Sequence, residues 1–106
     1  MNKKNKKTTE IKINNVLSIE KLKKYFSITK EALDMIKEKG IDENRKEIAL
    51  DFLDMAFRYY SDAEYFFKKG DYINAFGCLN YSHGWLDAGA RIKLFKVNDS
   101  RLFTVD

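Results

Sequence analysis

Apolar side chains recur every three or four positions along three long stretches of this 106-residue chain. This spacing is typical of one face of a helix in a bundle. The first stretch contains Ile19, Leu22, Phe26, Thr29, Leu33 and Ile36; the second runs from Ile48 to Phe66, and the third from Ala75 to Gly89. The pattern therefore predicts three amphipathic helices.

Capping residues and glycines mark where these helices begin and end. Ser18, Asp42 and Asp71 are each suited to cap a helix N-terminus, because a short side-chain oxygen can accept a hydrogen bond from a free main-chain N–H. Gly40 and Gly70 follow lysines, as is usual at helix C-termini. We predict helices over about residues 19–39, 43–69 and 71–95.

The connections near residues 40 and 70 are short, so consecutive helices should be antiparallel neighbours. The predicted fold is all-α, an antiparallel up-down-up three-helix bundle formed as one domain by residues 18–106. Residues 1–17 are predicted to form a basic flexible arm and strap. The apolar residues of this strap, Ile11, Ile13, Val16 and Leu17, either dock as an extended segment or, for the last two, staple the first helix.

The segment after residue 95 contains Leu102, Phe103 and Val105. These side chains are too apolar for a free end, and we expect the tail to pack back on the bundle. The absence of proline agrees with long helices.

Cys78 is the sole cysteine, which excludes an intrachain disulfide and a cysteine zinc site. We expect it to be a small buried apolar side chain in a cytoplasmic protein. No apolar run approaches the roughly 18 residues that span a bilayer, and we expect neither a membrane association nor a signal peptide.

The positive charge is concentrated at the start of the chain. Residues 1–40 hold 11 lysines against 5 acidic residues, a net charge of +6, whereas residues 41–106 have a net charge of −2. Residues 1–7 contain four lysines and nothing apolar after Met1, and are predicted to be disordered. Such an arm supports weak, salt-sensitive nucleic-acid binding at most; a solubilising role is the simpler interpretation.

Three glycines, Gly77, Gly84 and Gly89, lie inside the third predicted helix. Each costs about 1 kcal/mol relative to alanine in a helix interior. Close approach of a neighbouring helix is the usual compensation, and we expect tight packing here rather than a glycine-lined ligand groove.

Two lines of polar residues have matching spacings. Asn80, His83, Asp87 and Arg91 follow the third helix, and Asp51, Asp54, Arg58 and Asp62 follow the second. In antiparallel neighbours the two lines would run alongside each other. Our hypothesis pairs Asp62 with Asn80 or His83, Arg58 with Asp87, and Asp51 or Asp54 with Arg91; the alternative is two solvated lines with weak surface ion pairs.

His83 is the one histidine, and it lacks the spacing of a metal site. Cys78 lies five positions away, about 140° around a helix, which excludes a nucleophilic cysteine–histidine pair. A hydrogen-bonded structural histidine is the expected role; a general acid or base oriented by Asp87 or Asp62 is the alternative. No catalytic, cofactor or metal residue is predicted.

Aromatic residues surround the hairpin between the second and third helices. A three-helix core cannot hold all of them, so some should face outward and form an interface. Tyr60, Tyr81 and Trp85 are the candidate interface residues, and protein binding or self-association is favoured over base stacking.

The segment YYSDAEYFFKKGDYINAFGCLNYSHGWLDAGARIKLF with its LFTV tail resembles an uncharacterised archaeal family, domain of unknown function 357. The resemblance covers residues 59–105 and implies a small three-helix bundle with no catalytic residues to transfer. The chain also resembles, more weakly, the helical partners of minimal nucleotidyltransferases and the related helical ribonucleases. Those ribonucleases use an arginine followed a few residues later by a histidine. In this chain His83 precedes Arg91, which argues against nuclease activity.

We therefore expect a non-enzymatic protein-interaction or scaffolding module. A ligand-binding or catalytic bundle that uses His83, Asp87, Asp62 and Arg91 is the main alternative, and nucleic-acid association through the lysine arm is another. The first two differ in one feature: these polar side chains either are sealed in hydrogen bonds or line an open pocket.

Overall fold

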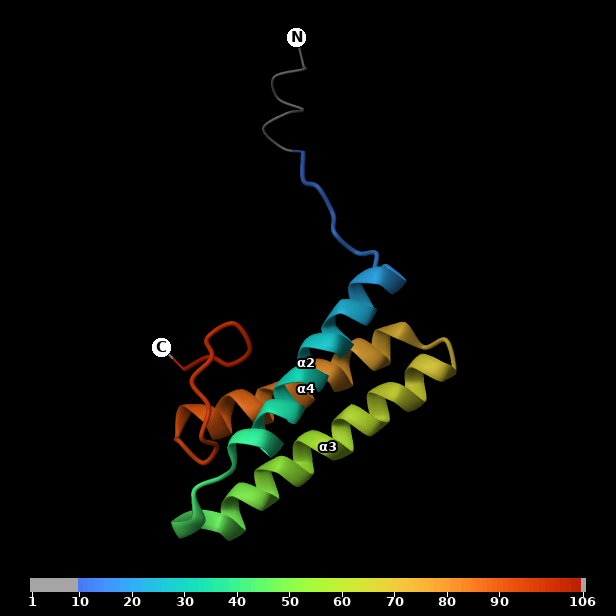
Figure 1. Ribbon diagram of the computed structural model, residues 1–106. Coiled ribbons are helices and arrows are strands. Elements are labelled where there is room, and N and C mark those ends of the chain that lie inside the picture. The colour runs from blue at the N-terminus through green and yellow to red at the C-terminus, as the bar shows by residue number, and fades with distance from the viewer. Residues whose placement is uncertain (1–9, 106) are drawn as a thin grey trace.

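The computed structural model describes residues 10–105, which form three long helices whose consecutive members run in opposite directions (Figure 1). Helix α2 spans Ile19–Lys39, α3 spans Lys46–Lys68 and α4 spans Tyr72–Arg91. A 3-10 turn, η1, covers Glu43–Arg45 and precedes α3. The all-α, three-helix prediction is confirmed. The predicted lysine arm, residues 1–7, lies outside the described residues.

The three predicted N-caps form. Ser18 accepts a hydrogen bond from the N–H of Lys21 at 3.1 Å, and Asp71 accepts one from the N–H of Asn74 at 3.2 Å. Asp42 accepts from the N–H of Asn44 at 3.0 Å, but it caps η1 rather than α3 itself. The second helix therefore begins three residues later than predicted.

Helices α3 and α4 pack closely through small side chains. Ala49, Ala56 and Ala63, spaced by seven along α3, are each fully buried. The hydroxyl of Ser82 on α4 donates to the main-chain carbonyl of Ala56 at 2.6 Å, which requires the two backbones to approach each other. The predicted antiparallel α3–α4 pair is present, and alanines of α3 permit its close packing.

Helix α2 covers one side of this pair with larger side chains. Leu22 lies in a buried cluster with Ala63, Ala75 and Leu79, and Leu33 and Ile36 lie in a second cluster with Leu86. Edge-to-face aromatic contacts of Phe26 with Tyr60 and Phe67, at centroid distances of 5.7 and 5.5 Å, join α2 to α3. Larger side chains thus fill the space between α2 and the α3–α4 pair.

Helix α4 ends at Arg91, four residues earlier than predicted. Lys93 has a φ of 63°, and the N–H of Leu94 donates to the carbonyl of Gly89 at 2.8 Å, which reverses the chain. The ring of Phe95 then folds back against Gly89. The sequence pattern placed Phe95 in the helix. In the structure Phe95 lies beyond the end of α4, and its side chain packs back against that helix.

The segment after α4 pairs with the α2–α3 connection. Ile41 and Phe95 form an antiparallel bridge, flanked by main-chain bonds from Asp42 to Leu94 at 2.8 Å and from Lys96 to Gly40 at 2.9 Å. Leu102 and Phe103 are buried. The prediction that the tail packs back on the bundle is confirmed.

The strap before α2 differs from one of its two predicted forms. Ile11, Ile13 and Val16 are each at least 76% exposed, so an extended docked strap is wrong. Leu17 packs against the cluster that contains Leu22, as the stapling alternative requires for that residue. Among the described helices, none has the length and apolar character needed to cross a bilayer.

Candidate functional surfaces

His83 lies between α2 and the C-terminal tail, with both ring nitrogens hydrogen-bonded. Its Nε2 lies 2.6 Å from the carbonyl of Leu102, and its Nδ1 lies 3.0 Å from the hydroxyl of Thr29. Because a carbonyl can only accept, we assign the hydrogen to Nε2, and Nδ1 accepts from Thr29. The ring of Phe103 stacks on the imidazole at a centroid distance of 6.5 Å.

Asp87, one turn further along α4, holds the next part of the tail. Its carboxylate accepts from the N–H of Thr104 at 2.9 Å and from the hydroxyl of Thr104 at 3.2 Å. It also lies 3.8 Å from Nε2 of His83. His83 and Asp87 together form a tail-binding pair that fixes residues 102–104.

A further contact ties the tail to α2. Arg101 donates two hydrogen bonds to Glu31, at 3.2 and 2.6 Å, and the same guanidinium lies 3.4 Å from Asp99. The Arg101 guanidinium lowers the pKa of the Glu31 carboxyl and the carboxylate in turn raises the pKa of Arg101. The tail is thus held from both α4 and α2.

The expected pairing of Arg58 on α3 with Asp87 on α4 does not form. Arg58 instead pairs with Asp54 on its own helix at 2.8 Å, and Asp87 pairs with Thr104. The side chain that faces α3 is Ser82, and His83 follows it about 100° further around the helix, toward α2. His83 and Asp87 of this line therefore meet α2 and the tail, not α3.

The remaining members of these lines also differ from the hypothesis. Asp62 and Asn80 are exposed and, within the described part of the chain, are not bonded to each other; both His83 nitrogens are engaged elsewhere. Asp54 pairs with Arg58 on its own helix, and the pairing of Asp51 or Asp54 with Arg91 stays a prediction. Arg91 lies at the rim of a hollow beside the tail.

The three helix-interior glycines fall into two classes. Gly89 is buried against the ring of Phe95, which would collide with an added Cβ. Gly77 and Gly84 are not fully buried, and an added Cβ would meet no atom within 4 Å. Tight packing was thus the correct interpretation for Gly89 alone, and there the neighbour is the tail, not another helix.

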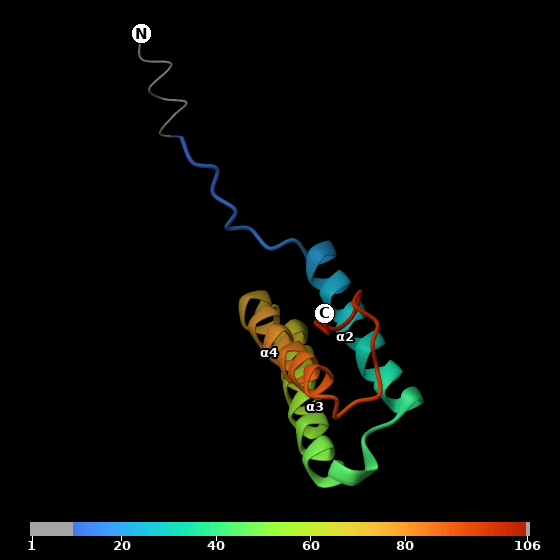
Figure 2. The same ribbon diagram turned by 90° about the vertical axis from the view of Figure 1, so that its left-hand side faces the viewer.

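Gly84 lies in a shallow groove on the side of α4 that other elements leave uncovered. The groove has a volume of about 350 Å³ and is lined by Asn80, Tyr81, Gly84, Trp85 and Ala88. Figure 2 shows α2 and the tail on the same side of α4.

Aromatic rings of two helices form a ridge beside that groove. Tyr81 contacts Tyr59 of α3 at a centroid distance of 4.4 Å, and Trp85 contacts Phe52 at 5.0 Å. Tyr81 is 52% exposed. We define the outer face as Tyr59, Tyr81, Gly84, Trp85 and Ala88.

Tyr60, also named as a candidate interface residue, lies elsewhere. Its ring packs on Phe26 of α2, and burial raises the pKa of its phenol. Cys78 is half-buried rather than fully buried, and burial raises the pKa of its thiol, which makes it a poor nucleophile. Among the described residues, no group of three His, Cys, Asp or Glu side chains could hold a metal ion.

Sequence reasoning missed the partners of the tail-binding pair. Thr29 occupies an apolar position of the α2 pattern, and this buried polar residue was the available signal that a hydrogen-bonding partner lies opposite it. Thr104 gave no such signal, since nothing in the sequence specifies the path of an irregular tail.

The family model described as "Protein of unknown function (DUF357)" matches residues 24–95. The chain belongs to this family. The match includes His83, Asp87 and the outer face, and it ends at Phe95, before the tail residues that the pair holds. No curated protein and no solved structure matches the chain.

Proposed function

We propose that the protein is a non-enzymatic interaction module that associates with a second copy of itself through the outer face. The observation that carries this proposal is the open groove at Gly84 beside the exposed ring of Tyr81. A hollow and a projecting ring lie on one surface, which is what a self-complementary interface requires.

Two copies of α4 crossing antiparallel at Gly84 would make use of both features. Residue 81 of one copy would then lie opposite position 87 of the other, so Tyr81 would enter the space beside Ala88 of the second copy. Glycine at the crossing point lets the two helix backbones approach closely. The residues of the groove carry no charge, so no ionised group would lose water on docking.

The size of the face sets the expected strength. The outer face spans residues 81–88 of α4, about 12 Å of helix, and two adjacent helices are about 20 Å wide, which gives about 240 Å² per copy. Stable interfaces bury about 800 Å² per partner. Because the face is smaller than this, we expect a weak dimer that dissociates in the upper micromolar range.

The tail-binding pair supports a non-enzymatic role. Catalysis needs a group that is free to meet a substrate, whereas both nitrogens of His83 and both oxygens of Asp87 have partners within the fold. We also propose a cytoplasmic location, on the basis of the lone half-buried cysteine, and an archaeal source, on the basis of the family resemblance.

Sedimentation velocity tests the proposal with two matched variants. Gly84→Gln fills the groove with a polar side chain without a clash in the monomer, and Tyr65→Ala removes a ring on α3 that is as exposed as Tyr81 but lies off the outer face. Over roughly 5–500 µM, the wild type and Tyr65→Ala should shift from monomer to dimer and Gly84→Gln should stay monomeric. A wild type that remains monomeric, or equal dimerisation of all three, would overturn the proposal.

A further inference from the structure

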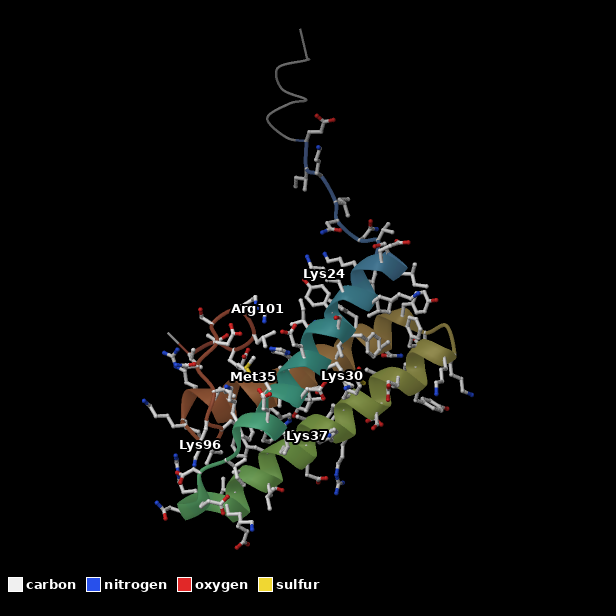
Figure 3. All side chains as sticks on the ribbon, in the orientation of Figure 1. Lys24, Lys30, Met35, Lys37, Lys96 and Arg101 are labelled. Atoms are coloured by element: carbon white, nitrogen blue, oxygen red, sulfur yellow. The ribbon has the colours of Figure 1, made fainter. Side chains whose placement is uncertain are left out.

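A second hollow, separate from the outer face, lies where the C-terminal ends of α2 and α4 meet the tail. Its volume is about 520 Å³, within the range of small-ligand sites. Four cationic side chains line it: Lys39, Arg91, Lys93 and Lys96. No acidic residue is among its described lining residues. Figure 3 shows Lys96 at this end of the bundle, with Lys24 toward the other end of α2.

The main-chain carbonyl groups near these cations already accept hydrogen bonds from other donors. The cationic side chains are therefore not needed as their hydrogen-bond donors. The carbonyl of Lys93 accepts from the Arg45 guanidinium at 3.0 Å, and the carbonyl of Leu94 accepts from the N–H of Asp42. The carbonyl of Gly40 accepts from the N–H of Lys96. The side chains of Lys39 and Lys93 form no hydrogen bond or ion pair with the part of the chain that the structure describes.

Lys39, Lys93 and Lys96 place like charges around one hollow, and a bound anion would relieve their mutual repulsion. Part of the positive charge is used elsewhere, since Lys96 also acts on Asp42, which pairs with Arg45. A single carboxylate carries one negative charge, whereas a phosphate monoester can carry two and accept several hydrogen bonds.

The floor of the hollow is apolar. Met35, Val97 and Val105 contribute half-buried side chains from α2 and the tail. The main-chain pairing of residues 41 and 95 holds these elements together. An apolar group on the ligand would gain from covering this floor, as a bare inorganic ion would not.

We propose that this hollow binds a small phosphate monoester that carries a compact apolar group. The phosphate would lie among Lys39, Lys93 and Lys96, and the apolar group would lie on Met35, Val97 and Val105. This inference is independent of self-association, since the hollow shares no residue with the outer face.

Phenyl phosphate is a suitable probe, titrated into ¹⁵N-labelled full-length protein at low salt and followed by amide chemical shifts. We expect saturable shifts confined to residues 35–41 and 90–98 and to Val105. Phenol lacks the phosphate of the probe, and inorganic phosphate lacks its apolar ring. Each should bind about tenfold more weakly than phenyl phosphate, which corresponds to about 1.4 kcal/mol for the missing half.

Charge-removing variants locate the site. Lys39→Gln and Lys96→Gln should each weaken binding about two- to fivefold, as expected for exposed ion pairs. Lys24→Gln changes a lysine that lies on α2, as Lys39 does, but outside the hollow, and it should leave binding unchanged. Val105→Ser should weaken phenyl phosphate binding and not that of inorganic phosphate.

Several results would overturn the inference. Equal losses in Lys24→Gln and Lys96→Gln would mean general attraction of phosphate to lysines. Equal affinity for inorganic phosphate and phenyl phosphate would remove any role for the apolar floor. Tighter binding of a single-stranded oligonucleotide, lost in the same variants, would make the surface a nucleic-acid site instead.

Discussion

The two sides of α4 use the same small residue in opposite ways. Gly89 faces inward, where the ring of Phe95 occupies the space that a side chain would need. Gly84 faces outward, over a groove with no atom within 4 Å of an added Cβ. The Phe95 ring thus excludes a side chain at position 89, whereas no atom of the monomer excludes one at position 84, where the proposed dimer would place a second helix.

The polar residues of α4 divide along the same line. His83 and Asp87 turn toward α2 and the tail, and their hydrogen-bonding groups are used within the fold. Asn80 faces outward and borders the groove. The inner side of α4 therefore organises the monomer, and the outer side is the surface that we propose for association.

The largest effect should come from breaking the tail-binding pair. His83→Ala leaves the Thr29 hydroxyl and the Leu102 carbonyl without partners, and each buried group left unpaired costs about 1–3 kcal/mol. With two groups affected, urea denaturation should show a decrease of about 2–6 kcal/mol in the free energy of unfolding. Asn80→Ala, one turn away on the exposed side, should change the free energy of unfolding by no more than about 0.5 kcal/mol. Equal effects of the two substitutions would place His83 outside the stabilising contacts.

The next largest effect should come from Gly89→Ala. The added methyl group collides with the Phe95 ring, and overpacking of this kind costs about 1–3 kcal/mol, partly offset by about 1 kcal/mol of helix propensity. We expect a lower melting temperature together with altered chemical shifts of Phe95. An unchanged or higher melting temperature would mean that Phe95 does not pack on Gly89.

Gly84→Ala should have the opposite sign. No atom opposes the new methyl group, so the monomer should gain up to about 1 kcal/mol from helix propensity. The measurement is denaturation at a concentration low enough to keep the chain monomeric, with Gly77→Ala as a second glycine whose added Cβ would meet open space. Destabilisation by Gly84→Ala would contradict the open outer face.

The smallest effect concerns the ion pair between α2 and the tail. Because Arg101 lowers the pKa of Glu31 below its ordinary value of 4.5, the pair stabilises the fold above that pH and the stabilisation is lost as the pH falls through the lower, folded-state pKa. Arg101→Gln should therefore reduce stability at pH 7 and make no difference at about pH 2. A loss that persists at the acidic pH would assign Arg101 a role other than pairing with Glu31.

Helix positions, caps and the α3–α4 hairpin could be predicted because they depend on local signals: spacing, Ser18, Asp71 and the two turn glycines. The partners of His83 and Asp87 could not, because they depend on the path of residues 92–104, which has no periodicity. Matching charge spacings suggested an α3–α4 network, yet Ala56 and Ser82 occupy that interface. Periodicity identified which residues share a face, but not which neighbour the face meets.

Cysteine cross-linking at the proposed crossing point tests the central claim most directly. In a Cys78→Ser background, Gly84→Cys places two thiols opposite each other if α4 pairs antiparallel at residue 84, whereas Ile73→Cys, also exposed on α4, places them far apart. Mild oxidation should give disulfide-linked dimers of the Gly84→Cys variant and not of the Ile73→Cys variant. Dimers that form equally well in both variants, or in neither, would contradict the claim that the outer face of α4 binds a second copy of the chain.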